Sequence, residues 1–471
     1  MRELPINIRL DAGSGKTLYE QIYEYIREEI RKGSLLQDER LPSARFLSDY
    51  LQVSRTTVDM AYGQLVAEGY LTAKPKKGYF VGDVKELYDT GVEVRREKPE
   101  YDEAKKMPAW RFDFSPTAID MSRFPYATWK KITKNILVDA RSSMFALGEP
   151  QGDMELRRTI CRYLHGSRGV NCEPEQIIVG AGNDFLLLLL EKILGRHIHV
   201  AMENPTYIRA YRIFRSFAYP ISLIPMDERG ICVDKLTFSG AQLAYVMPSH
   251  QYPTGVSMPI GRRMELLQWA AEGQDRYLIE DDYDSEFRYK GKPLPSLQAS
   301  DRQGRVIYIG TFSKAIAPAI RVSYMVLPYP LLERYRRECG FFSSTVSRID
   351  QTILNEFIRD GYFERYLNKM RKLYRTKHDL LLDGLKGLEG DFSLSGENAG
   401  LHVLLTDQRG RSEEQLERAA AEAAVKVYGM EAFRMDGTRE KGALATMILG
   451  YGGLSPEEIT EGIGILKKVW R

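Results

Sequence analysis

The sequence predicts an α/β protein built from a small N-terminal winged helix-turn-helix domain and a much larger body. Residues 1–81 contain three stretches with apolar residues at helical spacing, followed by two short strands around a basic turn. From residue 110 onward apolar strands alternate with helical stretches, which indicates a mainly parallel sheet with helices on both faces and a smaller C-terminal α+β subdomain. A chain of 471 residues is also too long for one hydrophobic core.

The composition is that of a globular protein, and we expect it to be cytoplasmic. Hydrophobic residues make up 43% and charged residues 28% of the chain, and the net charge is only +3, so nucleic-acid binding would need a local basic patch. The start has no apolar signal segment, and the longest apolar run, 185–190, is too short to span a membrane. The four cysteines form no C-x-x-C pair and make no ligand cluster with the six histidines, so no metal site is expected.

The N-terminal domain has clear helix start and stop signals. Apolar residues recur at helical spacing in its first helix, and Gly33 ends it. Ser43 and Ser54 are placed to cap a second and a third helix. The expected elements are helices over about 17–32, 44–51 and 55–68 and wing strands over 70–73 and 79–81.

A helix, turn, helix and wing in this order is a DNA-binding layout in which the third helix enters the major groove by its N-terminal end. The side chains at that end suit phosphate and base-edge contacts, and they are Ser54, Arg55, Thr56 and Thr57. A helical domain that binds another protein is the alternative, because acidic residues are almost as frequent as basic ones in residues 1–80. One such domain binds DNA weakly, so two on a homodimer are expected.

Two motifs in this domain carry a resemblance. They are L-P-S-x-R, starting at Leu41, and V-S-R-x-T-V-x-x-A-Y-x-x-L-x-x-E-G-Y, starting at Val53, and both resemble the GntR-type winged helix. The resemblance covers about residues 15–81. It implies DNA contacts from the second and third helices and from the wing, made by Arg45, Arg55, Lys76, Lys77 and Gly78.

A charged stretch without any apolar period separates the two parts. It runs from about residue 82 to 109, and we expect a flexible, extended linker there. The predicted domains are therefore 1–81, 82–109 and 110–471. Such a linker lets the DNA-binding domains move relative to the body.

In the body, a β-branched run predicts a buried strand that ends in a small polar turn followed by Lys314. Thr311, Ser313 and Arg321 nearby suit a phosphate, since hydroxyls donate hydrogen bonds and guanidinium binds oxyanions bidentately. A second predicted strand ends near Asp281. A lysine that forms a Schiff base, a phosphate cup and an acid for a ring nitrogen are what pyridoxal phosphate (PLP) needs. A plain surface lysine is the alternative that these neighbours disfavour.

The segment T-F-S-K-A-I-A-P-A-I-R, residues 311–321, resembles the lysine loop of fold-type I aminotransferases, S-x-S-K-x-x-x-P-G-x-R, with Ala319 in place of the glycine. This resemblance extends over residues 110–471. Together with the GntR-type domain, the chain resembles the MocR/GabR family of bacterial transcription regulators. The resemblance implies a fold-type I PLP-dependent aminotransferase-like body with the Schiff base on Lys314.

The same resemblance implies the rest of the cofactor site. The residues that it assigns to the phosphate are Gly182, Asn183, Asp184, Thr311, Ser313 and Arg321. Tyr207 would stack on the pyridine ring. Asp281 and Tyr283 lie two apart at a strand end, hence on one face, and would contact the ring nitrogen and the phenolic oxygen. Arg209 matches an arginine with which the family's GABA sensor holds its ligand's carboxylate.

Three positions depart from the enzymes and from the GABA sensor. Tyr252 replaces the asparagine of the P-x-x-x-N-P-T-G loop, and Ile448 replaces the arginine that binds the substrate carboxylate. Ala432 replaces an arginine of the GABA sensor. Efficient transamination and GABA as the ligand are therefore not expected. Whether His250 or Gln251 substitutes for the asparagine stays open.

The sequence therefore predicts a PLP-dependent regulator that binds promoter DNA and senses an amine or amino acid. The effector would displace Lys314 and form an external aldimine, which would change how the two DNA-binding domains of the homodimer are held. One alternative is an active PLP-dependent aminotransferase with an appended DNA-binding domain, and keto-acid formation would reveal it. The other is a regulator that senses PLP itself.

Overall fold

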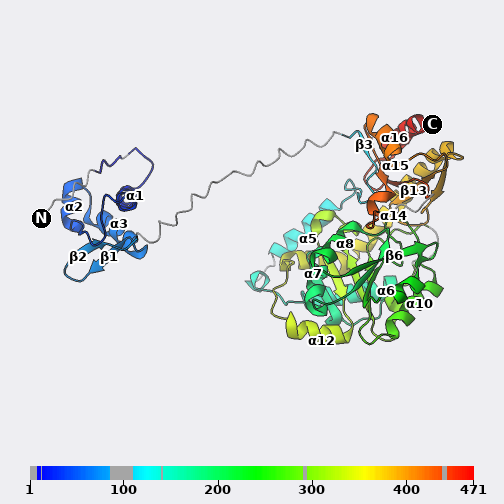
Figure 1. Ribbon diagram of the computed structural model, residues 1–471, viewed down its shortest axis with the longest axis horizontal. Helices are drawn as coiled ribbons and strands as arrows, with labels where there is room; N and C mark the ends of the chain where they lie inside the picture. Colours follow the sequence, from blue (N-terminus) through cyan, green and yellow to red (C-terminus); the bar gives the residue numbers. More distant parts are fainter. Residues whose placement is uncertain (1–7, 12, 85–109, 139–141, 290–293, 438–442) are drawn as a thin grey trace. The chain divides into compact units, whose positions relative to one another are not determined.

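The computed structural model describes residues 8–11, 13–84, 110–138, 142–289, 294–437 and 443–471. The chain divides into two compact units, Met1–Met107 and Pro108–Arg471 (Figure 1). Most of the predicted linker, residues 85–109, lies outside the described residues. Within the described part of the chain, no helix combines the length and the apolar character needed to cross a membrane.

The N-terminal unit is a winged helix, as predicted. Its elements are α1 (Leu18–Arg31), α2 (Ala44–Leu51), α3 (Arg55–Ala67), β1 (Leu71–Lys74) and β2 (Gly78–Val81). The side-chain oxygens of Ser43 and Ser54 accept hydrogen bonds from backbone amides in the first turns of α2 and α3, at 3.2 and 3.1 Å. Ile22, Val58 and Tyr62 pack in the middle of a core shared by the three helices, with none of their surface exposed.

The body is built on an eight-stranded sheet with the order β4-β11-β10-β9-β8-β5-β6-β7. Its strands are β4 (Ile177–Gly180), β5 (Val200–Asn204), β6 (Ile221–Asp227), β7 (Gly230–Ile231), β8 (Leu243–Val246), β9 (Tyr277–Asp282), β10 (Val306–Thr311) and β11 (Ser323–Val326). The run from β10 to β6 is parallel, whereas β11 is antiparallel to both of its neighbours and β7 is antiparallel to β6. The sheet is thus mainly parallel, as the alternation of strands and helices predicted.

Helices cover both faces of this sheet. In β10, Tyr308 packs into one core cluster, whereas Ile307 and Ile309 pack into another on the opposite face. The helices against the face of Tyr308 include α6 (Met154–Arg168) and α13 (Arg348–Arg359), and those against the other face include α7 (Asn183–Leu194), α8 (Ile208–Ser216) and α12 (Tyr329–Glu338). Both faces are therefore dry, which explains the continuous apolar runs in the sequence.

A smaller C-terminal subdomain adds a four-stranded antiparallel sheet with the order β12-β13-β16-β15. Its elements are β12 (Phe392–Ser395), β13 (His402–Asp407), β15 (Tyr428–Gly429), β16 (Thr446–Gly450) and the helices α14 (Tyr362–Leu385), α15 (Glu413–Glu422) and α16 (Pro456–Val469). The first strand of the body, β3 (Phe112–Asp113), pairs with β14 (Val425–Lys426) of this subdomain. The chain therefore enters the body beside its own C-terminal part.

One expectation about the cysteines is wrong. We expected no cluster of cysteines with histidines, yet Cys161, His165 and Cys172 lie together at the end of α6. Cys161 and His165 share one face of the helix, and the chain then turns back to bring in Cys172. The approach depends on this turn, which the spacing in the sequence does not reveal.

Candidate cofactor site

One pocket lies where β4, β5, β8, β9 and β10 end. Parallel strands bring their carboxyl ends to the same edge of a sheet, and the loops that follow them build the pocket. Its volume is about 190 Å³. It is lined by Thr117, Ile119, Asn183, Asp184, Tyr207, Arg209, Met247, Tyr252, Asp281, Tyr283, Thr311, Ser313, Lys314, Pro318 and Arg321. The structure thus brings together Arg209 and every residue assigned to the cofactor except Gly182, which lies immediately beside the pocket.

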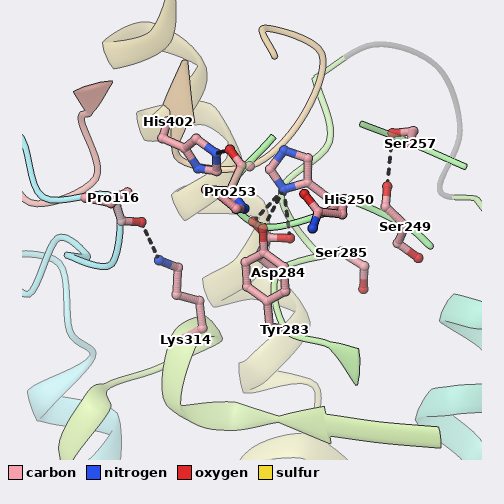
Figure 2. A network of polar contacts seen from close by, with 12 residues as sticks. Pro116, Ser249, His250, Pro253, Ser257, Tyr283, Asp284, Ser285, Lys314 and His402 are labelled. Carbon is pink, nitrogen blue, oxygen red and sulfur yellow. Dashed lines mark hydrogen bonds and ion pairs between the residues drawn. The ribbon is translucent and has the colours of Figure 1, made fainter. Parts of the chain in front are cut away.

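Lys314 comes from a single helical turn, α11 (Phe312–Ala315), directly after β10. Its Nζ donates hydrogen bonds to the carbonyl oxygens of Pro116 and Thr117, at 3.1 and 3.2 Å, and Figure 2 shows the first of these contacts. Burial lowers the pKa of the Lys314 amine from its usual value to about 8, although the Asp284 carboxylate acts in the opposite sense. The amine is therefore much easier to deprotonate than that of a surface lysine.

The segment that carries those carbonyls is anchored by a buried ion pair. Lys377 of α14 lies 2.6 Å from the Asp120 carboxylate and also donates to the carbonyl of Gly452 at 3.1 Å. Lys377 is completely buried. Since Asp120 follows the pocket-lining Ile119, this pair holds the first segment of the body against the reactive lysine.

The glycine turn at the start of α7 meets an arginine. Gly182 has φ +94°, and a Cβ there would overlap the Arg321 guanidinium, so only glycine allows this approach. Arg321 also adopts a left-handed conformation, with φ +50°. Its Nη2 lies 3.4 Å from the Asp184 carboxylate, and Arg209 reaches the same carboxylate at 3.3 Å. Two cations and the first amides of α7 therefore meet at this end of the pocket.

Two buried polar atoms here have no hydrogen-bond partner among the described residues. They are Ser313 Oγ and Asn183 Oδ1. Thr311 Oγ1, in contrast, is used internally, since it accepts from the Ser313 amide at 3.2 Å and from the Ser323 hydroxyl at 2.8 Å. Buried polar groups are normally paired, so the two unpaired atoms indicate that a polar ligand belongs in this pocket.

Asp281 lies at the floor of the pocket and is 4% exposed. Burial raises the pKa of its carboxyl to about 7, even though Tyr245 and Asn183 donate hydrogen bonds to it. The Asn183 contact is 3.4 Å long. A carboxyl with such a pKa gains a great deal from a buried cationic partner, which would restore its charge.

One wall of the pocket is aromatic. The ring of Tyr252 lies edge-on to Tyr207 and Tyr283, each at 5.9 Å, and to Phe433 at 5.4 Å. Ile448 is fully buried behind this wall in the same apolar cluster. The two positions that depart from the aminotransferase pattern, 252 and 448, therefore replace polar groups with apolar packing.

Behind the pocket, the Tyr283 hydroxyl lies 3.0 Å from Nδ1 of His250, which also contacts the Asp284 carboxylate at 3.0 Å (Figure 2). Gln251 instead bonds the carbonyl of Pro205 at 2.9 Å. Neither His250 nor Gln251 lines the pocket, so neither occupies the place of the missing asparagine. Of Tyr283, His250 and Asp284, it is Tyr283 that lines the cavity.

In the N-terminal unit, the predicted DNA-contacting residues lie on the exposed surface of α2, of the start of α3 and of the wing. Arg55 is 70% exposed in its side chain and lies 3.4 Å from the Asp59 carboxylate. The hydroxyls of Ser54 and Thr57 bond each other at 2.7 Å as part of the cap. Arg45, Thr56, Lys76 and Lys77 are exposed, and Gly78, with φ +102°, turns the wing.

Several residues that line or support the pocket were not predicted. Tyr245 lies in the middle of β8, where an aromatic residue suggests only core packing. Thr117 and Ile119 come from a segment about two hundred positions from Lys314, and no local motif marks them. His250 contacts Tyr283 from a different loop, at 3.0 Å. A tertiary contact, and no local spacing, brings each of them to the site.

Comparisons with known proteins agree with both parts. Residues 18–81 match the family of bacterial regulatory proteins, gntR family, and residues 120–442 match aminotransferase class I and II. An uncharacterized HTH-type transcriptional regulator of Bacillus subtilis (strain 168), YdeL, is 41% identical over 96% of this chain and 97% of its own length. The probable rhizopine catabolism regulatory protein MocR of Rhizobium meliloti is 31% identical over 98% of this chain and 95% of its own.

Among solved structures, the kynurenine aminotransferase of Pyrococcus horikoshii in complex with PMP is similar to the body. It is 25% identical, with a TM-score of 0.67 over 76% of this chain and 90% of that one. Fold and sequence together thus define an HTH-type transcriptional regulator with an aminotransferase-like domain. More closely, the chain belongs to the MocR/GabR family.

Proposed function

We propose that this protein is a PLP-dependent transcription regulator whose body senses an amine or amino acid. Such a regulator works in the cytoplasm, on promoter DNA. The observation that carries the proposal is the half-buried Lys314, with its lowered pKa, in one pocket with the buried Asp281, the aromatic Tyr207 and the cationic Arg321. When bound, PLP supplies an aldehyde that condenses with primary amines and a ring nitrogen that withdraws electrons once protonated.

The residues at the α7 end fit the phosphate. Arg321 supplies a guanidinium, and Ser313 supplies a buried hydroxyl with no other described partner. The side-chain-free Gly182 lets the Arg321 guanidinium come close to the first amides of α7, which favour an anion. Asp184 opposes this charge at 3.4 Å from Arg321, and we expect it to turn toward Arg209 when the phosphate binds.

The residues around the ring have separate tasks. Asp281 would lie beside the pyridine nitrogen and keep it protonated, because a cation there stabilises the carboxylate that burial disfavours. Tyr207 would cover one face of the ring, and the Tyr283 hydroxyl would bond the phenolic oxygen. Lys314, whose amine is held by the carbonyl oxygens of Pro116 and Thr117, would be the amine that condenses with the aldehyde and that an effector amine replaces.

The pocket favours sensing over turnover. Tyr252 lines the pocket and Ile448 is buried behind it, so apolar packing stands where an aminotransferase has an asparagine and the arginine that binds the substrate carboxylate. Two arginines, Arg209 and Arg321, are among the lining residues. If Arg321 binds the phosphate, Arg209 remains to bind the carboxylate of an effector. Sensing needs only that the effector bind one conformation of the body more tightly than another.

The test begins with the purified full-length protein and added PLP. We expect a visible absorption band, fixation of PLP on the peptide containing Lys314 after borohydride reduction, and loss of both in Lys314→Ala. Titration with a panel of amines and amino acids should shift the band for the effector, while keto-acid formation stays absent. A protein that stays colourless with PLP refutes the proposal, and steady keto-acid production would identify an aminotransferase instead.

Operator binding, measured with PLP alone and with PLP plus the effector, separates the two sensing schemes. An effector that changes DNA affinity in the PLP-loaded protein supports amine sensing. If PLP alone accounts for the whole change and no amine adds to it, the protein senses PLP itself.

We propose that the N-terminal unit contacts DNA through Arg45, Arg55, the amino end of α3 and the wing. Arg45→Ala and Arg55→Ala should each weaken operator binding and lower the slope of affinity against salt by about one. Lys32→Ala is the matched control, since Lys32 is 61% exposed in its side chain but follows α1 as its C-cap residue. An unchanged slope in both arginine variants would refute this interface.

We also propose that the body forms a homodimer. Large apolar side chains are exposed at the end of α5 (Tyr126–Val138) and in the segment after it, among them Val138 at 74%, Phe145 at 69% and Leu147 at 88%. Such a patch is typical of an interaction surface. Leu147→Asp should yield a monomer in sedimentation experiments, whereas Phe238→Asp, at an equally exposed position on α9 (Val233–Phe238), should not. A monomeric wild type would contradict the proposal.

A further inference from the structure

A second group of reactive side chains lies outside the cofactor pocket, at the C-terminal end of α6. The sulfur atoms of Cys161 and Cys172 and a ring nitrogen of His165 all lie within 4.8 Å of one another. The distance from Cys161 Sγ to His165 Nε2 is 3.7 Å. None of the three residues lines the cofactor pocket.

The backbone holds this group together. Cys161 and His165 are four residues apart on α6 and hence on the same face. Gly169, with φ +67°, ends the helix and turns the chain back toward it. The Cys172 carbonyl then accepts a hydrogen bond from the Cys161 thiol at 3.2 Å and lies 2.8 Å from His165 Nε2. The three side chains are therefore preorganised before any ligand binds.

We propose that Cys161, His165 and Cys172 form a binding site for a thiophilic divalent cation of the zinc class. Two thiolates and one imidazole are the ligands that such an ion prefers. In a tetrahedral zinc site, bond lengths of about 2.3 Å to sulfur and about 2.0 Å to nitrogen place neighbouring ligand atoms roughly 3.5 to 3.8 Å apart. The 3.7 Å between Cys161 and His165 already has this value.

The exposure of these three residues indicates what occupies the fourth coordination position of the ion. Cys161 and Cys172 are 5% and 2% exposed, whereas His165 is exposed. An ion held by these three residues therefore lies at the edge of the protein, and water completes its coordination. The ion would tie the segment between α6 and β4 to the helix.

Binding exchanges protons for the ion. Each thiol enters the reaction as S–H, and that of Cys161 donates a hydrogen bond to the Cys172 carbonyl. Two S–H bonds break, two metal–sulfur bonds form, and two protons pass to the solvent. His165 gives up the hydrogen bond that its Nε2 donates to the Cys172 carbonyl, its proton moves to Nδ1, and the Nε2 lone pair binds the ion. The association constant should therefore rise with pH.

The experiment uses the reduced full-length protein with Co²⁺ as a spectroscopic probe and Zn²⁺ as a competitor. We expect the intense visible bands of a tetrahedral cobalt thiolate, which Zn²⁺ abolishes. Cys161→Ser and Cys172→Ser should lose these bands, and His165→Ala should weaken binding at least about tenfold. Cys232→Ser and Cys339→Ser are the matched controls and should behave as the wild type.

Thermal unfolding provides a second readout. Zn²⁺ should raise the Tm of the wild type and of both controls but not that of Cys161→Ser. Because His165 is exposed, His165→Ala tests the site even if a cysteine variant fails to fold. Absence of cobalt bands in the wild type, or bands that persist in all three ligand variants, would overturn the proposal.

Discussion

The reactivity of Lys314 gives a prediction whose size follows from its surroundings. Burial lowers the pKa of its amine to about 8. An ordinary lysine has a pKa near 10.5, so at pH 7 about a tenth of Lys314 is unprotonated, against roughly one part in three thousand for an ordinary lysine. Only the neutral amine attacks an aldehyde. We therefore expect Lys314 to capture PLP about three hundred times faster than an equally accessible surface lysine of the same intrinsic reactivity.

The assay is stopped-flow absorption of the PLP-free protein mixed with PLP, across pH 6 to 10. The observed rate should rise with pH and level off with a midpoint near 8, and borohydride trapping should locate the product on Lys314 at each pH. Lys314→Arg removes the reaction and serves as the control. A midpoint near 10, or labelling spread evenly over surface lysines, would refute the claim that burial activates Lys314.

Three further predictions concern other parts of the chain. Asp120→Asn leaves the buried Lys377 without its partner at 2.6 Å and should lower the free energy of unfolding in urea by about 3–5 kcal/mol. Adding Lys377→Met should recover most of this loss, and no recovery would show that the unpaired lysine is not its cause. Burial alone would raise the pKa of Asp120, but hydrogen bonds from Lys377 and Ser122 hold that pKa below its usual value. The stabilisation by the ion pair should therefore be full at neutral pH and be lost as the pH falls through the lowered pKa. Asp281→Asn should stabilise the PLP-free body by about 1 kcal/mol above pH 7, because the raised pKa of about 7 makes the native carboxylate costly there. The same change should weaken PLP binding, and a loss of stability at pH 8 would contradict the reasoning. Ser54→Ala removes the cap of α3 and should cost the N-terminal unit about 1 kcal/mol, measured by hydrogen exchange of its amides in the full-length protein, with Ser54→Asp retaining most of it.

The overall architecture could be predicted because its signals are local. Ser43 and Ser54 were predicted as caps, and both make the expected hydrogen bonds. The apolar run that ends near Lys314 was predicted as a buried strand, and β10 is buried on both faces. Capping and burial periodicity depend on neighbours within a few positions, which is why they are visible in one dimension.

The candidate site was predictable where a motif marks it and not elsewhere. The lysine loop and the glycine turn at Gly182 are each one continuous stretch of sequence, so their residues could be named in advance. Tyr245, the segment at Thr117 and the His250–Asp284 pair could not, because each depends on a contact between distant elements. The cluster of Cys161 and His165 with Cys172 was missed for the same reason, since a helix end and a turn create it.

The sequence by itself determined which chemical groups the chain has and in which local elements they lie: a capped helix before the wing, a lysine after a buried strand, and an acid at the end of another. The tertiary structure alone decided their environment. Burial gives Lys314 and Asp281 their displaced pKa values, and Arg321 is placed against Gly182 by the crossing of two loops. The physical reason is that desolvation and long-range contact depend on what surrounds a group in space, which neighbours along the chain do not specify.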